Sequence, residues 1–201
     1  MSGMACGGKE TGVVIVISGP SGSGKTTMVK RVLEEDPGLV WSVSATTRKP
    51  RQGEIDGGDY WFLTREEFER RVASGAFAEY AESFGNLYGT PAGPVREALE
   101  SGRTILLDID VQGARQIRKK FPEAVLIFIR PPDIRTLKDR LRKRRSETGK
   151  QFDERVRRAQ AELDCAGEYD HVVVNDVLNV AVNELRNLIQ LTKEKRRGER
   201  S

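Results

Sequence analysis

One short segment, residues 19–26, limits what this chain can fold into more than any other. It reads Gly-Pro-Ser-Gly-Ser-Gly-Lys-Thr and closely follows residues 13–17, a run of β-branched side chains that is typical of a buried parallel strand. A helix is predicted next over residues 25–35, and the Asp-Pro-Gly that follows would end it. Such a strand, loop and helix gather backbone N–H groups at a helix N-terminus, where they can hold phosphate.

The segment therefore predicts a site for the phosphates of ATP. Lys25 would bridge the β- and γ-phosphate oxygens, and the Thr26 hydroxyl would bind Mg²⁺. A Gly- and Ser-rich turn without a ligand is the alternative, and the order of strand, loop and helix argues against it. The predicted cofactor-binding residues are Gly19, Pro20, Ser21, Gly22, Ser23, Gly24, Lys25, Thr26 and Thr27.

The remaining hydrophobic pattern predicts an α/β core. Buried strands are expected at residues 104–109, 124–129 and 172–174, and each is followed by a helical stretch, the last of them over residues 180–191. Strands that alternate with helices predict a parallel sheet with helices on both faces. Residues 43–91 break this rhythm with glycines among aromatic and charged residues, which predicts a small inserted subdomain of mixed strands.

Composition favours a folded, water-soluble chain. Of the 201 residues, 37% are hydrophobic and 32% charged, and the longest apolar runs are too short to span a bilayer. No signal-like stretch is seen at the start, and two cysteines, Cys6 and Cys165, make no disulfide framework. We therefore expect a cytoplasmic protein with no membrane association.

Charge balance does not identify the partner. The formal net charge is +4, from 34 basic and 30 acidic residues, with basic clusters at residues 140–145 and 193–200. The second cluster is predicted to be a solvated tail. The first explains binding of a phosphorylated small molecule as well as it explains binding of nucleic acid.

Two further groups of polar residues suggest chemistry. Asp108 and Asp110 end a predicted strand at spacing i and i+2, so both should point to one side near the sheet edge. One could orient a magnesium-bound water and the other could meet a substrate, or both could be a solvated strand end. Residues 42–60 combine two arginines, hydroxyls and a tyrosine, which suits a second phosphate site, although an incidentally charged surface loop has similar composition.

The motifs together resemble the guanylate kinase family. They are the glycine-rich loop, Ser-Val-Ser-Ala-Thr-Thr-Arg-Lys-Pro-Arg-Gln-Gly-Glu from Ser42, then Gly-Asp-Tyr, Tyr-Gly-Thr and Leu-Asp-Ile-Asp-Val-Gln-Gly. The match covers nearly all of residues 13–191. It implies a three-layer P-loop NTPase core with a parallel sheet, an inserted GMP-binding subdomain and a helical lid.

The resemblance also implies the roles of individual residues. The GMP phosphate would be bound by Ser44, Arg48, Arg51, Tyr60 and Tyr88. Guanine would be read by Glu79, Thr90 and Asp108, which suits carboxylates that accept from N1–H and N2 and a hydroxyl that donates to O6. The lid would supply Arg140, Arg144 and Arg155, which with Lys25 are the predicted catalytic residues. Asn175 lies where the family contacts adenine, and Thr26 with Asp110 are the predicted magnesium ligands.

The predicted organisation has five parts. They are a flexible leader at 1–12, a core at 13–42, 93–132 and 163–191, a GMP-binding insert at 43–92, a lid at 133–162 and a basic tail at 192–201. The reaction implied is ATP plus GMP to ADP plus GDP, with no nucleic-acid partner and the oligomeric state left open. Two rivals remain: a module of this fold that binds a protein partner without turnover, and a P-loop protein acting on nucleic acid.

Three smaller expectations concern residues outside this chemistry. His171 should be structural, and Pro91 should stiffen the return from the insert. The aromatic residues of the insert are predicted to form its core, namely Trp61, Phe62, Phe68 and Phe77.

Overall fold

The computed structural model describes residues 12–143 and 149–198. Its strands are β1 (Val13–Ser18), β2 (Leu39–Trp41), β3 (Ala45–Thr46), β4 (Trp61–Phe62), β5 (Phe77–Ser83), β6 (Asn86–Pro91), β7 (Thr104–Asp108), β8 (Val125–Arg130) and β9 (His171–Val174). Its helices are α1 (Lys25–Glu35), α2 (Arg65–Ala73), α3 (Ala92–Glu100), α4 (Val111–Lys120), α5 (Ile134–Lys143), α6 (Gly149–Asp164), a short 3₁₀ helix η1 (Cys165–Glu168) and α7 (Leu178–Gly198).

A five-stranded parallel sheet forms the centre of the molecule, in the order β2-β7-β1-β8-β9. The predicted parallel sheet is therefore confirmed. Every residue of β1 is buried, which explains its uninterrupted β-branched sequence. The edge strand β2 was not predicted, because three residues are too few to display a periodic pattern.

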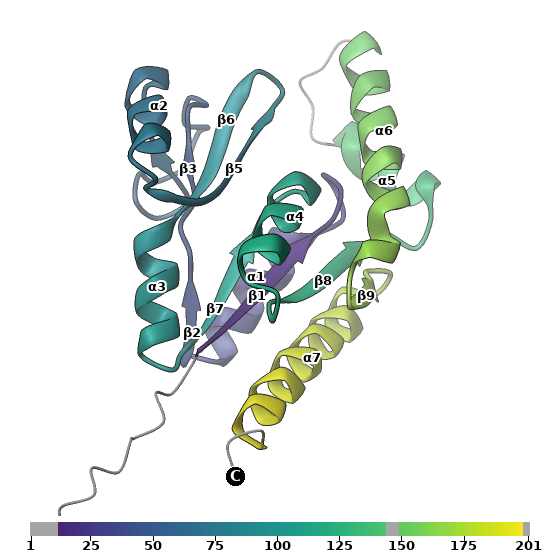
Figure 1. Ribbon diagram of the computed structural model, residues 1–201. Helices are drawn as coiled ribbons and strands as arrows, with labels where there is room; N and C mark the ends of the chain where they lie inside the picture. The colour runs from purple at the N-terminus through teal and green to yellow at the C-terminus, as the bar shows by residue number, and fades with distance from the viewer. Residues whose placement is uncertain (1–11, 144–148, 199–201) are drawn as a thin grey trace, which may run out of the picture.

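Helices cover both faces of this sheet (Figure 1). On one face, Val13, Ile15 and Ile17 of β1 pack with apolar side chains of α1 and α7. On the other face, Val14 and Val16 pack with side chains of α3 and α4. The alternating sides of one strand thus join two hydrophobic layers, and the loop after β1 emerges at the carboxyl edge of the sheet.

A second, four-stranded sheet with the order β4-β3-β6-β5 stands above this edge beside α2. β3 pairs with β4 in parallel and with β6 antiparallel, so the strands are mixed. Its core holds Ala45, Phe68 and Phe77, and the two phenylalanine rings stack at 4.5 Å between centroids. The expectation that Trp61 belongs to this core is wrong: it is 44% exposed on the edge strand β4 and lies against Gly57.

Helices α5 and α6 stand on the opposite side of the same edge (Figure 1). They share a small core of Leu137, Leu141 and Ala159, so this pair of helices has packing of its own. The two helices were expected between residues 132 and 163, and both are found there. The connection between them lies outside the described residues.

Helix α7 continues well past the predicted end at residue 191. It runs to Gly198, and Lys193 donates to Asp36 at 2.7 Å while Arg196 pairs with Glu123. Residues 192–198, expected in a solvated basic tail, are thus helical, and two of their charges attach α7 to neighbouring elements. Within the described part of the chain, no helix is long and apolar enough to cross a membrane.

Candidate active site

The loop between β1 and α1 forms a tight cradle in which two glycines are required. Gly24 has φ of +94°, and a Cβ there would lie 2.2 Å from the Asn175 side-chain nitrogen. Gly19 has φ of +140°, and its Cβ would lie 2.0 Å from the Ile129 carbonyl oxygen. Lys25 Nζ donates to the Gly19 carbonyl oxygen at 2.5 Å, which holds the ammonium group over the loop.

Asn175 and Arg140 support this loop from behind. Asn175 is 4% exposed, and its amide donates to the Ser23 carbonyl oxygen at 2.7 Å. Arg140 donates to the Asn175 carbonyl oxygen at 3.0 Å and to the Ser23 carbonyl oxygen at 3.5 Å. The Asn175 side chain, which was predicted to contact adenine, thus forms a hydrogen bond with the backbone of the phosphate loop.

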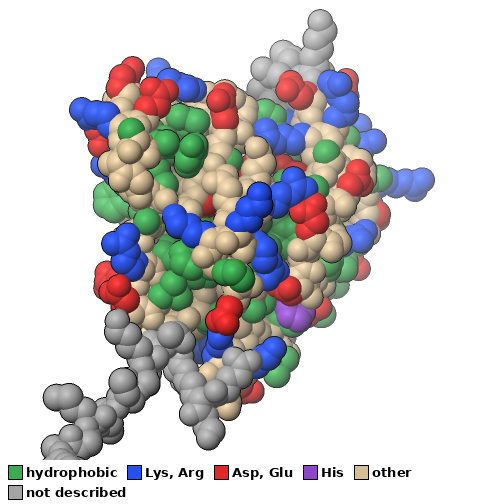
Figure 2. Space-filling view, in the orientation of Figure 1, with side chains coloured by type: hydrophobic (Ala, Val, Ile, Leu, Met, Phe, Trp, Pro, Cys, Tyr) green, Lys and Arg blue, Asp and Glu red, His purple; other side chains and the backbone are tan. Residues whose placement is uncertain are grey.

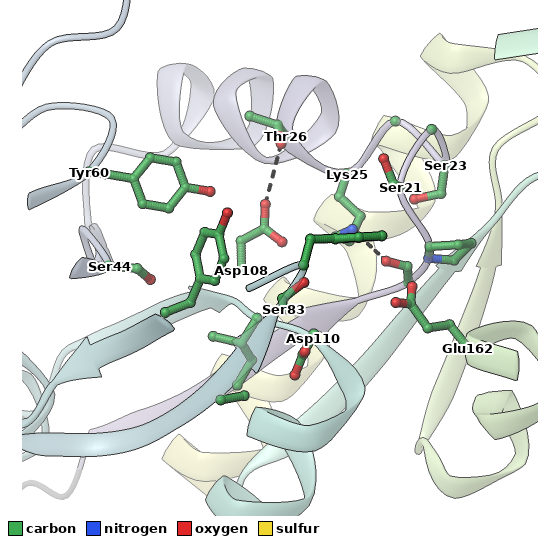
Figure 3. Close-up of a pocket in the computed structure, with 18 of the residues that line it drawn as sticks. Ser21, Ser23, Lys25, Thr26, Ser44, Tyr60, Ser83, Asp108, Asp110 and Glu162 are labelled. Carbon is green, nitrogen blue, oxygen red and sulfur yellow. Dashed lines mark hydrogen bonds between the residues drawn. The ribbon is translucent and has the colours of Figure 1, made fainter. Parts of the chain in front are cut away.

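A cavity of about 280 Å³ opens in front of the loop (Figure 3). A second cavity of about 1070 Å³ adjoins it, and the two share seven lining residues. The shared residues are Ser21, Thr26, Thr27, Ser44, Arg51, Tyr60 and Asp108. The structure therefore brings the predicted loop and several of the predicted acceptor residues to one continuous space.

Asp108 lies on the phosphate side of this space. Thr26 Oγ1 donates to Asp108 Oδ2 at 3.4 Å, as the dashed line in Figure 3 shows. Burial raises the pKa of Asp108, and the charge of Lys25 and the hydrogen bond from Thr26 oppose that rise. Asp108 thus bonds to Thr26 of the loop and interacts with the charge of Lys25.

Asp110 occupies a different place from the one predicted. The strand β7 ends at Asp108, so Asp110 does not share a strand face with it, and it is instead the N-cap of α4. Its Oδ1 accepts from the backbone N–H groups of Gln112 and Gly113, at 2.9 and 3.0 Å. Carboxylates two residues apart are separated here because the chain turns from strand into helix between them.

Glu79 is a buried carboxylate on β5 that lines the first cavity. The pKa of Glu79 is raised to about 7, and burial is the main cause. The charge of Asp110 adds to this rise, and the hydrogen bond from Thr90 opposes it. Thr90 Oγ1 donates to Glu79 Oε1 at 2.6 Å, so its proton goes to Glu79 and not, as predicted, to a ligand oxygen. A Cβ on Gly113 would lie 2.4 Å from Glu79 Oε2, so that glycine makes room for the carboxylate.

The predicted phosphate-binding residues of the insert gather around Arg48. Its guanidinium forms two hydrogen bonds of 2.9 Å with the carboxylate of Glu54 and lies 5.4 Å from the centroid of the Tyr60 ring. Tyr88 meets Tyr60 edge-on at 6.1 Å, and burial raises the pKa of Tyr60 to about 12. Ser44 and Arg51 line the cavities beside them.

The lid residues are placed only in part. Arg155 on α6 donates to Ser21 Oγ at 2.9 Å, which brings a further cation to the loop besides Lys25 and Arg140. Arg144 lies outside the described residues. Two residues of α6 that sequence reasoning missed join the site: Glu162 lines the first cavity, and Arg158 pairs with Glu162 at 3.3 Å and with Asp110 at 3.6 Å. The i, i+3, i+7 spacing of the three residues on one helix face was the signal that could have found them.

The fold and the loop define a phosphate-loop nucleotide-binding protein. A family model described as guanylate kinase matches residues 11–192. The chain belongs to the guanylate kinase family.

Individual relatives agree with this assignment. A guanylate kinase of Maricaulis maris (strain MCS10) is 46% identical over 190 residues, which cover 94% of this chain and 87% of that protein. A guanylate kinase of Synechocystis sp. (strain ATCC 27184 / PCC 6803 / Kazusa) is 49% identical over 178 residues, which cover 89% of this chain and 93% of that protein. The crystal structure of guanylate kinase from Anaplasma phagocytophilum superposes with a TM-score of 0.77 at 34% identity, covering 92% of this chain and 88% of that one.

Proposed function

We propose that this protein transfers the γ-phosphoryl group of ATP to GMP, giving ADP and GDP. The observation that carries the proposal is Glu79, a buried carboxylate held by Thr90 that lines the same cavity as the phosphate loop. Guanine presents N1–H and an N2 amine, both donors, whereas adenine presents a lone pair at N1. A carboxylate at this position therefore favours guanine as the base of the acceptor.

The acceptor phosphate would bind between Arg48, Arg51, Ser44 and the two tyrosine hydroxyls of Tyr60 and Tyr88. Glu54 fixes the plane of the Arg48 guanidinium through its paired hydrogen bonds, which orients the N–H groups that remain for a phosphate. Tyr60 donates as a neutral phenol, since its pKa is raised to about 12. These groups would hold the GMP phosphate oxygens and point one of them at ATP.

The donor side of the reaction belongs to the loop. The backbone N–H groups of residues 19–26 would hold the β-phosphate, and Lys25 would bridge the β- and γ-oxygens. Arg155 is next to the loop at Ser21, where its charge can stabilise the phosphoryl group in transit. Arg140 is attached to the back of the loop, so we propose a positioning role for it, and Arg144 remains a predicted lid cation.

We propose that Asp108 and Asp110 exchange the roles predicted from the sequence. Thr26 Oγ1 and Asp108 Oδ2 lie 3.4 Å apart, and a hydroxyl with a carboxylate is an oxygen donor set that suits Mg²⁺. When bound, Mg²⁺ neutralises charge on the β- and γ-oxygens. Asp110 lies close enough to raise the pKa of Glu79 by its charge, which supports a place beside the guanine N2 amine.

The same observations support the two alternative functions less well than they support GMP phosphorylation. A partner-binding module without turnover has no need of Lys25, Thr26 and Arg155 gathered at one loop. Figure 2 shows Lys and Arg side chains concentrated over α4, which would suit nucleic acid. However, Arg115 pairs with Glu168 and Arg118 with Asp170, so part of this positive charge is neutralised.

The proposed organisation keeps residues 43–92 as the acceptor-binding insert and 133–162 as the lid on a core from 13–42, 93–132 and 163–191. The cytoplasm remains our proposal for the location.

A coupled assay with ATP and each of the four nucleoside monophosphates tests the proposed function. GMP should be the preferred acceptor, and AMP should be rejected by up to about 10⁴-fold in kcat/KM, because buried carboxylates would be left unpaired. AMP turnover that rivals GMP turnover would overturn the acceptor assignment. ATP hydrolysis that depends on a polynucleotide would favour the nucleic-acid rival.

A further inference from the structure

Arg158 joins the helix α6 to the wall that holds the acceptor base. Its guanidinium carbon lies 4.6 Å from the centroid of the Phe84 ring, at the turn between β5 and β6. One of its terminal nitrogens lies 3.6 Å from Asp110 Oδ2, and its Nε donates to Glu162 Oε1 at 3.3 Å. Phe84 and Asp110 are distant from α6 in sequence, and Figure 1 shows α6 and the β5–β6 turn facing each other.

Phe84 is an unusual residue at this turn. Among the described residues other than glycine, it is the one with positive φ, at +50°, and its side chain is 52% exposed. A bulky residue in the left-handed region costs free energy, so a persistent left-handed Phe84 requires compensating contacts. The guanidinium of Arg158 provides one such contact on the face of the ring.

The neighbouring arginine on the same helix face has another target. Arg155 donates to Ser21 of the phosphate loop, three residues before Arg158 turns toward Phe84 and Asp110. Arg158 itself lines neither of the two cavities, although Phe84, Asp110 and Glu162 all line the first. The helix α6 thus presents one cation to the donor loop and a second to the outside of the acceptor-base wall.

We infer that Arg158 is a positioning residue for the acceptor: it fastens α6 to Phe84 and Asp110 and so holds the wall of the base pocket in place. This inference rests on the proposed function, since it assigns the wall to the acceptor. Loss of the contact should weaken GMP binding while the phosphate loop keeps its own cation, Arg155. A residue that contacted ATP phosphates would instead affect ATP and the turnover number.

Steady-state kinetics of Arg158→Gln test this division. The KM for GMP should rise about 5- to 10-fold, since a partly exposed ion pair and a cation–π contact are each modest. The KM for ATP should stay within about two-fold, and the turnover number within about three-fold, by the same reasoning. Arg157→Gln is the matched control, because it removes the same charge from an exposed position one residue away and should leave all three constants unchanged.

A double-mutant cycle identifies the contact itself. Phe84→Leu should raise the KM for GMP in the wild-type background and have little further effect in Arg158→Gln. Arg158→Lys should rescue only part of the loss, because lysine keeps the charge but not the flat stacking surface. Additive effects of the two substitutions, or a loss confined to ATP, would overturn the inference.

Amide hydrogen exchange gives a readout that does not depend on turnover. In the protein without nucleotides, Arg158→Gln should speed exchange at residues 84–87, and Phe84→Leu should speed exchange in α6, whereas Arg157→Gln should change neither. Unchanged exchange in both variants would overturn the contact. If the wild-type protein failed to phosphorylate GMP while exchange behaved as expected, the proposed function would be wrong and the contact between α6 and the turn would stand.

Discussion

Lys25 is the side chain on which phosphoryl transfer should depend most. Its side chain lines the first cavity, and its ammonium group donates to the Gly19 carbonyl oxygen at 2.5 Å. Lys25→Met should lower kcat by about 100-fold or more, as expected for removal of a group that stabilises charge in the transition state. Lys119→Met on the exposed surface of α4 is the control. A folded Lys25→Met protein, checked by circular dichroism, with near-normal turnover would contradict the mechanism.

Glu79 should make GMP use depend on pH. It accepts from both N1–H and the N2 amine of guanine only when ionised. Its pKa is raised to about 7, so kcat/KM for GMP should fall as pH drops below about 7, toward about ten-fold per unit. The phosphate of GMP also titrates near this range, so the comparison is with Glu79→Gln under identical conditions. That variant should have low kcat/KM and lack the component due to Glu79. Identical pH profiles for the two proteins would contradict the assignment.

The same carboxyl group should affect stability with the opposite sign. Its folded-state pKa of about 7 exceeds the reference value of 4.5, so the folded protein binds the proton more tightly. The stability contributed is fully present below about pH 4.5 and is lost as pH rises through about 7. Binding of the acceptor should improve over the same pH interval, so ionisation of Glu79 lowers the stability of the fold while it favours GMP binding.

At the residue scale, sequence reasoning predicted the loop better than the carboxylates. Residues 19–26 sit in a motif whose spacing fixes both backbone geometry and ligand. Asp108 and Asp110 sit where a strand turns into a helix, and the sequence could not show that Asp110 leaves the strand to cap α4. The family resemblance assigned Thr90 to the ligand. Its bond to Glu79 joins two strands, and the sequence could not show this bond because such pairing depends on tertiary register.

The first turn of α4 borders the proposed site for the base. A Cβ on Gly113 would lie 2.4 Å from Glu79 Oε2, the mobile end of a side chain. Gly113→Ala should therefore displace the carboxylate and raise the KM for GMP by about 10-fold, the loss of about one hydrogen bond to a charged group. Stability should hold or improve, because alanine favours a helix over glycine by up to about 1 kcal/mol.

Gly93→Ala is the matched control for this substitution. Gly93 lies in the first turn of α3, and a Cβ there meets nothing within 4 Å. It should change neither the KM for GMP nor the KM for ATP, as measured in the coupled assay beside thermal unfolding. Gly113→Ala with wild-type GMP kinetics would show that Glu79 needs no such approach to α4.

At the element scale, long patterned segments were predicted and short ones were not. The helix at residues 25–35 and the strands β1, β7 and β8 carry runs of buried residues that identify them. Strands β2, β3 and β4 have two or three residues each and exist only through pairing with distant partners. The end of α7 was misplaced because its last turns are polar and are attached by Lys193 and Arg196.

The molecule as a whole should change shape when both nucleotides bind. A site that admits two anions and then excludes water needs its flanking parts to approach each other. In this structure Arg158 and Phe84 already join α6 to the β5–β6 turn. A bisubstrate analogue should lower the radius of gyration measured by small-angle scattering below that of the protein without nucleotides. An unchanged radius would argue against closure.

One cavity should hold GMP with its base at Glu79 and Asp110 and its phosphate toward the loop beside Asp108. The measurement is kcat/KM for GMP and for IMP, which lacks the N2 amine, in Asp110→Asn and Asp108→Asn. Asparagine caps helices as well as aspartate does, so the start of α4 should be preserved.

The wild-type protein should prefer GMP over IMP by about 10- to 100-fold, the value of the lost hydrogen bonds to charged groups. Asp110→Asn should remove most of this preference. Asp108→Asn should lower kcat/KM for GMP and for IMP by the same factor and leave the preference intact. The reverse pattern, in which Asp108→Asn removes the preference and Asp110→Asn keeps it, would contradict the orientation of GMP in this cavity.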